Sequence, residues 1–310
     1  MLSIISIVGS SISFCCLVMT VFTYTVFRNL RRHSPSKIVY NLCWALLLFN
    51  GLFLLGRYFP TILREAVRCK AMAALLHYSL LASMFWMSVN AFYMYISVVK
   101  VFNVQIARFI LKCFLFAWGL PAVLVVLTLL INDTENYGRL YTNFCWIRKP
   151  AFYVTLVSPV ATSLLINLAV FCLSMIEISK SNKRHSSMLI NERKSFMANF
   201  RVAFVLLILL GLTWTFAFFS FGELGTLFSY LFSIFNSLQG MFIFTFYCLL
   251  KREVHNAWLV LCGCQIEDIV ITSKYSESRV SRSSLSKQSK YYEFKFTTSK
   301  DSGSSSAQEG

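Results

Sequence analysis

Charged residues are scarce in this chain of 310 residues. Asp, Glu, Lys and Arg together make up 14% of it, whereas hydrophobic residues make up 57%. A soluble domain carries about a quarter charged residues, so this composition excludes a water-solvated globule. Coiled coils, collagen-like chains and disordered proteins are excluded as well. The apolar residues come in long blocks, which favours one bundle of membrane-spanning helices over two soluble domains.

Ionisable side chains are almost absent from the apolar blocks. Apart from groups near block ends, such as Lys112, Glu177 and Glu223, His77 is the one such group well inside a block. Transporters and proton pumps usually need ionisable groups at mid-membrane, which disfavours a channel or carrier. The sequence also lacks HExxH, GxSxG and Walker motifs and paired inward carboxylates. These absences argue against an enzyme, and no metal or cofactor is expected.

Seven apolar stretches are long enough to cross a bilayer, which takes about 20 residues in a helix. They lie at residues 4–27, 38–59, 70–99, 109–131, 151–178, 199–221 and 225–250. We therefore predict an all-α membrane protein whose seven-transmembrane helix bundle covers residues 1–250.

A short amphipathic segment, 251–261, follows the last apolar stretch. Val254 and Trp258 stand there at helical spacing, with polar residues between them, so an eighth helix is expected along the inner membrane surface. Cys262 and Cys264 follow it and are candidates for palmitoylation. A metal site would need further Cys or His partners, and none lies nearby in the sequence. The polar remainder, 262–310, is predicted to be a disordered cytoplasmic tail.

Lys and Arg in the short loops indicate the orientation. With the N-terminus outside, the inner loops carry most of these residues, although the first outer loop is basic too. The glycosylation pattern Asn-Asp-Thr at Asn132 then also falls outside; the alternative is that Asn132 lies too near the membrane to be modified.

The first apolar run is of span length and is followed by Arg28, Arg31 and Arg32, which indicates a stop-transfer segment and not a cleavable signal peptide. Any extracellular domain is expected to be missing from this chain.

Two of the ten cysteines are expected on the outer face. Cys69 precedes the third span, and Cys145 lies in the loop after the fourth. Two thiols on the oxidising side form a natural disulfide, which would hold the second outer loop over the third helix. The alternative is two free thiols. Cysteines inside the spans are expected to be small apolar packing residues.

Amide side chains inside the spans need hydrogen-bond partners, so they are expected to face inward and bridge helices. They are Asn50, Asn90, Asn167, Asn236 and Gln239. Either they are structural links, or their pairing changes between two helix arrangements.

Several short motifs follow one another along the chain. They are PSKI at 35–38, NLC at 41–43, HY at 77–78, FWM at 85–87, VKVFN at 99–103, WGLPA at 118–122, FCWI at 144–147, GLTW at 211–214 and LQG at 238–240. In this order they resemble the heptahelical domain of adhesion G-protein-coupled receptors (class B2), particularly subfamily G. The resemblance runs from Ile4 to about Trp258. Rhodopsin-like hallmarks, such as proline after Asn236, are absent.

The resemblance implies a plasma-membrane receptor that passes an extracellular or tethered-peptide agonist signal to heterotrimeric G proteins through helix rearrangement. In the family, a large extracellular region cuts itself near the first span, and the new stub folds into the bundle as agonist. Neither the cleavage site nor the stub is present in this chain, so this route is not carried over to it.

The resemblance also implies roles for individual residues. Agonist contacts are expected at Trp146, Phe152, Trp214, Phe218, Phe232 and Phe235, with plain core packing as the alternative. Switch and core positions are Trp86, Asn90, Tyr93, Tyr95, Asn236 and Gln239. A basic wall facing the G protein would come from Arg28, Lys37, Lys100, Lys194 and Arg201; it would suit an acidic-rimmed partner helix or anionic membrane lipid, and the alternative is positive-inside topology alone.

Two departures from the family pattern lie near the expected coupling region. Asn90 stands where many members have Glu, and Tyr93-Met94-Tyr95 stands where many have His-Leu-Tyr or His-Met-Tyr. A non-signalling adhesion or decoy remnant therefore stays open beside the receptor. Phosphorylation of the Ser-rich tail would create a docking strip and suggests receptor kinases and arrestin as partners, the alternative being an inert solubilising tail.

Overall fold

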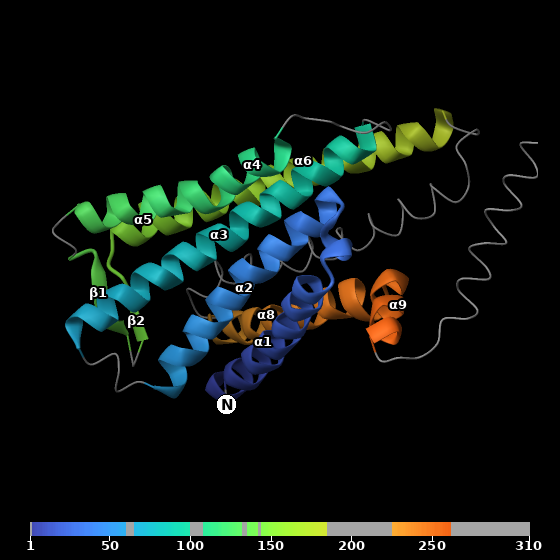
Figure 1. Cartoon of the computed structure of the whole chain (residues 1–310). Coiled ribbons are helices and arrows are strands. Elements are labelled where there is room, and N and C mark those ends of the chain that lie inside the picture. The colour runs from blue at the N-terminus through green and yellow to red at the C-terminus, as the bar shows by residue number, and fades with distance from the viewer. Residues whose placement is uncertain are drawn as a thin grey trace, which may run out of the picture. The chain divides into compact units, whose positions relative to one another are not determined.

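The computed structural model describes residues 2–59, 65–99, 108–131, 135–141, 144–184 and 225–261. The chain divides into two units, residues 1–255 and 256–310. In the second unit the described residues are 256–261, the end of a helix. The described residues of the first unit form long helices and one small hairpin (Figure 1). The predicted span at 199–221 lies outside the described residues.

The described elements follow the apolar stretches in order. They are α1 (Leu2–Val26), the 3-10 helix η1 (Arg28–Arg31), α2 (Ser34–Tyr58), α3 (Ala66–Val99), α4 (Phe109–Phe114), the π-helix η3 (Leu115–Gly119), α5 (Leu120–Leu130), β1 (Tyr137–Tyr141), β2 (Phe144–Ile147), the π-helix η4 (Phe152–Val157), α6 (Ser158–Arg184), α8 (Gly225–Phe244), the π-helix η5 (Thr245–Leu249) and α9 (Arg252–Leu261). Six helical stretches within these described residues are long and apolar enough to cross a membrane.

Proline explains several local features of the helices. Pro35 stands in the first turn of α2, where its missing N–H would be unbonded anyway. Pro121 follows η3, and Pro159 follows η4. Because proline cannot donate to the carbonyl four residues earlier, the regular ladder is interrupted there, and both spans widen into a π-helical turn just before the proline. Sequence analysis predicted none of these turns, nor η1 or the hairpin.

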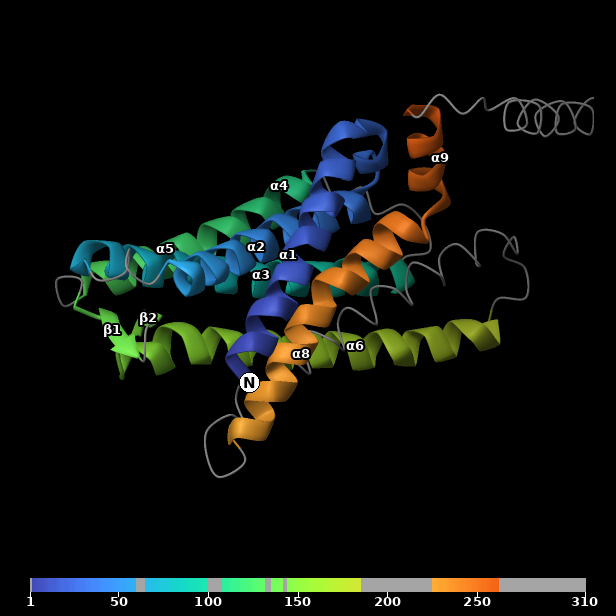
Figure 2. The same ribbon diagram turned by 90° about the horizontal axis from the view of Figure 1, so that it is seen from below.

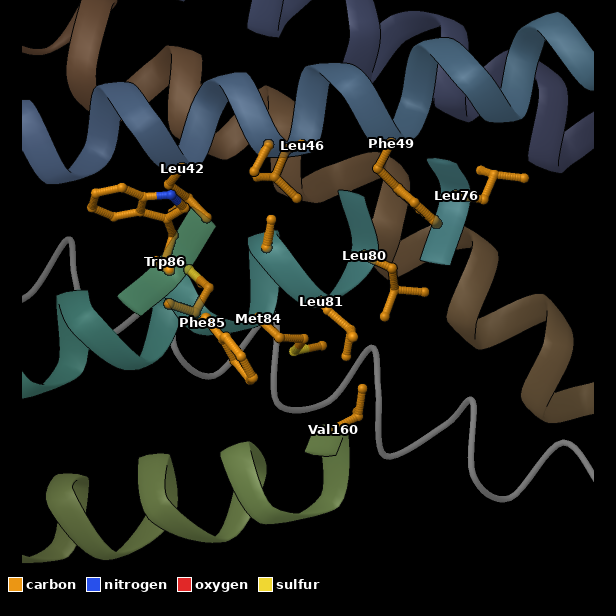
Figure 3. Close-up of a cluster of buried hydrophobic side chains, with 14 of the residues drawn as sticks. Leu42, Leu46, Phe49, Leu76, Leu80, Leu81, Met84, Phe85, Trp86 and Val160 are labelled. Atoms are coloured by element: carbon orange, nitrogen blue, oxygen red, sulfur yellow. The ribbon is translucent and has the colours of Figure 1, made fainter. Parts of the chain in front are cut away.

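Helix α3 is the centre of the bundle. In its most apolar window 83% of the residues are buried, against 22–44% in the other five spans. It packs against α2 on one side and α6 on the other, and against α5 and the hairpin. Figure 3 shows Leu42, Leu46 and Phe49 of α2 pointing toward α3, and Val160 of α6 approaching from the opposite side.

Helices α1 and α8 lie side by side (Figure 2), in the most extensive helix–helix contact of the described chain. Small residues make this approach possible. A Cβ atom built on Gly240 would lie 2.7 Å from the Ser13 carbonyl oxygen and 2.8 Å from the Ser13 Cα. The Ser6 and Ser233 hydroxyls are hydrogen-bonded across the same interface at 2.7 Å.

Gly240→Ala is expected to destabilise the protein, because the new methyl group meets the Ser13 hydroxyl and also the Ser13 backbone of α1, which cannot turn away as a side chain can. Overpacking of this kind costs about 1–3 kcal/mol, and thermal unfolding of the purified chain in detergent measures it. Gly119→Ala is the matched control: a Cβ atom there meets nothing within 4 Å. Equal midpoints for Gly240→Ala and the wild type would contradict the close α1–α8 contact.

Candidate functional site

The hairpin β1–β2 lies at the end of the bundle where α3 begins (Figure 1). The strands pair antiparallel, with Leu140 opposite Cys145. Cys145 forms a disulfide with Cys69 in the first turn of α3, so the predicted bond is confirmed. Cys145 and Ile147 are buried and point into the bundle core. The hairpin therefore covers the start of α3 and is covalently attached to it.

An ion cluster joins the base of the hairpin to α3. Glu135, just before β1, pairs with Lys70 of α3 at 2.8 Å and with Arg148 after β2 at 3.3 Å. The hydrogen bond from Lys70 and the positive charges of Lys70 and Arg148 lower the pKa of the Glu135 carboxyl. Since Glu135 is exposed, its pairs orient the hairpin more than they stabilise it.

A buried histidine links the hairpin to two helices. His77 of α3 is fully buried; its Nδ1 lies 2.8 Å from the Tyr137 hydroxyl and its Nε2 lies 2.9 Å from the Thr155 carbonyl oxygen. A carbonyl only accepts, so Nε2 donates to Thr155. In the neutral imidazole Nδ1 then accepts from Tyr137. One ring therefore ties β1 to both α3 and η4.

The local sequence explains why the Thr155 carbonyl is available. In an α-helix the carbonyl of Thr155 would accept a hydrogen bond from the N–H of the residue four positions later. That residue is Pro159, which has no N–H. The fifth span therefore has no α-helical donor for this carbonyl. His77, which lies 78 positions away in the sequence, supplies one instead.

The surroundings of Tyr137 keep its hydroxyl protonated, so that it can donate a hydrogen bond. Burial raises the pKa of its phenol to about 12, against a smaller opposing effect of a hydrogen bond with the Thr128 side chain. The side-chain amide of the neighbouring Asn136 donates to the carbonyls of Thr128 and Ile131 at 3.1 and 2.8 Å, and the backbone carbonyl of Asn136 accepts from the Arg148 N–H. The beginning of β1 is thus fastened to the end of α5 as well.

An aromatic cluster lies deeper in the bundle, around Trp118 of η3. Trp86 of α3 is fully buried and meets the Trp118 ring edge-on at 6.3 Å between centroids. Trp118 Nε1 donates to Asn41 Oδ1 of α2 at 3.2 Å, and its carbonyl accepts a long 3.4 Å hydrogen bond from Tyr78. This cluster joins α2, α3 and η3, and Trp118 stands at its centre.

The other end of the bundle joins α1, α2 and the end of the last span. Tyr24 donates from its hydroxyl to the Tyr247 carbonyl at 3.1 Å. Lys251 lies over the Tyr24 ring at 5.8 Å and donates to the Ser36 hydroxyl at 3.4 Å. These contacts hold the beginning of α2 against the chain that leaves the last described span.

The predicted agonist residues divide into three groups. Trp146 of β2 and Phe152 of η4 are half-buried and pack against the same core around α3. Phe232 and Phe235 are half-buried on α8, outside that core cluster. Trp214 and Phe218 lie outside the described residues. The structure thus places two of these aromatics in or next to the hairpin, against the bundle core.

The other predicted site residues are placed as follows. Asn90 is buried, Tyr93 packs 5.9 Å from Phe109, and Tyr95 and Asn236 are half-buried. Arg28 is exposed and Lys37 is half-buried. Six of these other predicted positions lie outside the described residues; they are Lys100, Asn132, Lys194, Arg201, Cys262 and Cys264.

Several buried polar atoms have no hydrogen-bond partner in the described part of the chain. Four of them belong to predicted switch or amide positions, and they are Asn50 Oδ1, Trp86 Nε1, Asn167 Oδ1 and Gln239 Nε2. Asn50 uses its amide N–H to bond Leu46 of its own helix and not a neighbouring helix. The bridges predicted for the amides of Asn90, Asn167, Asn236 and Gln239 stay predictions.

Sequence analysis missed the roles of His77, Tyr137 and Asn41. It noted His77 as a lone ionisable group but named no partner. Pro159 was the available signal, since a proline marks a carbonyl four residues earlier that needs another donor. Asn41 lies in the NLC motif but was given no role, and its partner Trp118 is 77 positions away.

The described helices, with their disulfide-fastened hairpin, form a multi-pass helical membrane bundle. Residues 1–243 match the model of the family described as 7 transmembrane receptor (Secretin family), and the chain belongs to this family. The predicted all-α membrane fold is confirmed. The family is one of receptors and not a class of enzymes, and the protein is a multi-pass protein of the plasma membrane.

Relatives agree with the resemblance predicted from the motifs, which is confirmed. The chain is 40% identical over 266 residues to human Adhesion G-protein coupled receptor G4, covering 85% of the chain and 8% of the relative. It is 39% identical over 273 residues to human Adhesion G-protein coupled receptor G2 (84% and 26%). It is 40% identical over 275 residues to Adhesion G-protein coupled receptor G6 of Danio rerio (84% and 23%). The chain therefore spans about a quarter or less of these relatives.

His77→Phe is expected to lower the free energy of unfolding by about 1–3 kcal/mol, because two buried hydrogen-bonding groups lose their partner. Tyr137→Phe should cost less alone and nearly nothing once His77 is gone. The double-mutant cycle, measured by thermal unfolding in detergent, gives the coupling directly. Tyr78→Phe is the control, because it removes only the 3.4 Å hydrogen bond on the neighbouring residue. Strictly additive effects of the two changes would show that the histidine does not hold the hairpin.

Glu135→Gln is expected to lower the unfolding midpoint slightly at neutral pH and not at all in acid. The folded-state pKa of Glu135 is lowered, so its contribution is present above the unfolded-state pKa of about 4.3 and disappears as pH falls through the folded-state value. Midpoints of wild type and variant, compared from pH 7.5 downward, should therefore converge at low pH. Glu65→Gln serves as control for loss of an exposed carboxylate on the same surface. A difference that persists below the folded-state pKa would rule out the charged pair as its cause.

Proposed function

We propose that this chain is the signal-transducing membrane domain of an adhesion-type receptor, which responds to a peptide agonist at its outer face and activates heterotrimeric G proteins at its inner face. The observation that carries the proposal is the family match over residues 1–243, together with relatives whose similarity to this chain is confined to a part of their length. The relatives are named as G-protein coupled receptors, which supports the same partner here.

The proposed orientation puts the hairpin outside and the turn between α1 and α2 inside. The Cys69–Cys145 disulfide supports it, because such bonds persist on the oxidising side of a membrane. The excess of Lys and Arg in the opposite loops supports it independently.

The agonist site is proposed beside the hairpin. Trp146 and Phe152 come from different elements and pack against one core, and each leaves part of its ring uncovered. Half-buried aromatic rings suit an apolar peptide side chain, since they offer large contact area at a small cost in side-chain entropy. Phe232 and Phe235 of α8 and the sequence-predicted Trp214 and Phe218 complete the proposed site.

Helix α3 is proposed to carry the signal. Its outer end holds the hairpin through the disulfide and His77, its middle holds Trp86, and its inner half contains Asn90 and Tyr93. The buried polar atoms without partners support a second arrangement of the helices. A helix movement that paired these atoms would form new hydrogen bonds, and these would offset the free-energy cost of the movement. Arg28, Lys37, Lys100, Lys194 and Arg201 are proposed to face the G protein; arrestin, receptor kinases and membrane lipid are proposed as further partners.

The sharpest test measures GTP exchange on purified G proteins of the main classes, with the chain in lipid discs and a series of apolar peptides. An active peptide should be found, and Trp146→Ala or Phe152→Ala should raise its half-maximal concentration about tenfold or more, as removal of a central aromatic contact does. Phe92→Ala, which removes an exposed ring elsewhere on α3, should leave it unchanged. Failure of every peptide with every G-protein class would contradict the proposal and favour a non-signalling relative.

A further inference from the structure

The turn between α1 and α2 gathers positive charge that forms no ion pair within the part of the chain that the structure describes. Arg28, Arg31 and Arg32 lie within five positions, and the first acidic residue of the chain is Glu65. Among the described residues, every ion pair lies elsewhere, with carboxylates of Glu65, Glu135 and Glu253. A folded turn with three guanidinium groups and no carboxylate leaves their charge for an outside partner.

The turn is ordered and not a loose basic loop. It forms the 3-10 helix η1, in which Leu30 N–H donates to the Phe27 carbonyl at 3.0 Å. Leu30 is buried and anchors the turn to the bundle. Its arginines are therefore presented from a fixed position at the end of the bundle opposite the hairpin (Figure 1).

Arg31 lies over an aromatic ring. Its guanidinium carbon lies 4.7 Å from the centroid of the Tyr40 ring, within the range of a cation–π contact. Tyr40 is fixed in turn by the hydrogen bond of its hydroxyl with Thr25, at 3.0 Å. The Nε–H of Arg31 is buried and has no acceptor. A guanidinium fork matches phosphate oxygens in particular.

The aromatic surface continues along α2 toward the middle of the bilayer. Trp44 meets the Tyr40 ring edge-on at 6.3 Å and is 43% exposed, although it lies in an apolar span. An exposed tryptophan on a spanning helix faces lipid. Trp and Tyr gather at the level of the headgroups, where an apolar ring meets a polar boundary. Trp44, Tyr40 and Arg31 therefore follow one another from hydrocarbon to headgroup.

We propose that Arg31, Arg32, Tyr40 and Trp44 form a binding site for the phosphorylated inositol headgroup of an anionic phospholipid. The guanidinium groups take the phosphates, and the aromatic rings contact the glycerol and upper acyl region. Several adjacent arginines without carboxylates favour a headgroup with more than one phosphate. The lipid-facing Trp44 favours a lipid over a G-protein contact, which would form at the inner opening of the bundle. In a cell the site rests on the orientation proposed above, because that orientation places η1 at the inner leaflet, where such lipids reside.

The test uses the full chain in detergent micelles, with bound lipid counted by native mass spectrometry. Phosphatidylinositol bisphosphate is expected to bind in preference to phosphatidylserine and phosphatidylcholine. Equal binding of phosphatidylserine would overturn the polyphosphate site. Both ends of the protein are accessible in micelles, so the outcome does not depend on orientation, which an N-terminal epitope on intact cells measures separately.

Arg31→Lys is the decisive variant, because it keeps the charge but loses the flat fork and its stacking on Tyr40. It is expected to weaken binding of the bisphosphate lipid about fivefold, and Arg31→Gln at least as much. Lys112→Gln is the matched control, since it removes an exposed cation at the end of α4 and should change affinity less than about twofold. Unchanged binding by Arg31→Lys, or an equal loss in Lys112→Gln, would show diffuse charge attraction and overturn the site.

The soluble headgroup inositol trisphosphate separates a lipid from a free phosphate compound. It is expected to compete weakly, because it cannot use the surface of Tyr40 and Trp44. Competition as strong as that of the lipid itself would overturn the lipid assignment. Thermal unfolding of each variant confirms that it is folded, so a loss of binding is not a loss of structure.

Discussion

Inside a bilayer a polar group has no water to bond, so each one must find its partner within the protein. Helices solve this for the backbone, and short hydroxyl side chains solve it by bonding their own helix, as Thr20 and Thr23 do with carbonyls one turn earlier. Proline breaks that solution. At Pro159 it removes a donor from the backbone, and the carbonyl of Thr155 turns to His77 on another helix. The place where the fifth span is irregular is thus also where it is joined to α3 and to the outer hairpin.

Packing supplies the rest of the cohesion, since lipid tails are as apolar as leucine and give helices no hydrophobic reason to associate. Close approach has to come from small residues, and Gly240 against the Ser13 backbone is the clearest case. Around α3 the core is made by larger side chains, with Leu46 of α2 on one side and Val160 of α6 on the other (Figure 3). Interlocked side chains move in steps and not continuously, and that property lets a bundle adopt distinct states.

The two ends of the bundle have different chemistry. At the hairpin end, Cys69, Glu135 and His77 hold one loop by a covalent bond, an ion pair and buried hydrogen bonds. At the other end, Arg31 lies over the Tyr40 ring but forms no ion pair with a carboxylate in the described chain. The first end is internally satisfied and suited to hold a shape. The second leaves groups for partners outside the protein, and a receptor bundle needs both.

Long apolar runs such as 4–27 and 225–250 predicted the spans because a helix needs only local sequence and a fixed length to cross a bilayer. The disulfide was predictable for a similar reason, since Cys69 and Cys145 are the two cysteines beside the predicted outer ends of spans. The partners of His77 were not, because they stand 60 and 78 positions away, and their meeting depends on how three elements pack. The same holds for Trp118 with Asn41 and for Arg31 with Tyr40. Sequence alone determined which segments enter the membrane; only the tertiary structure decided which polar groups face one another, because that pairing is a property of helix positions and not of any one helix.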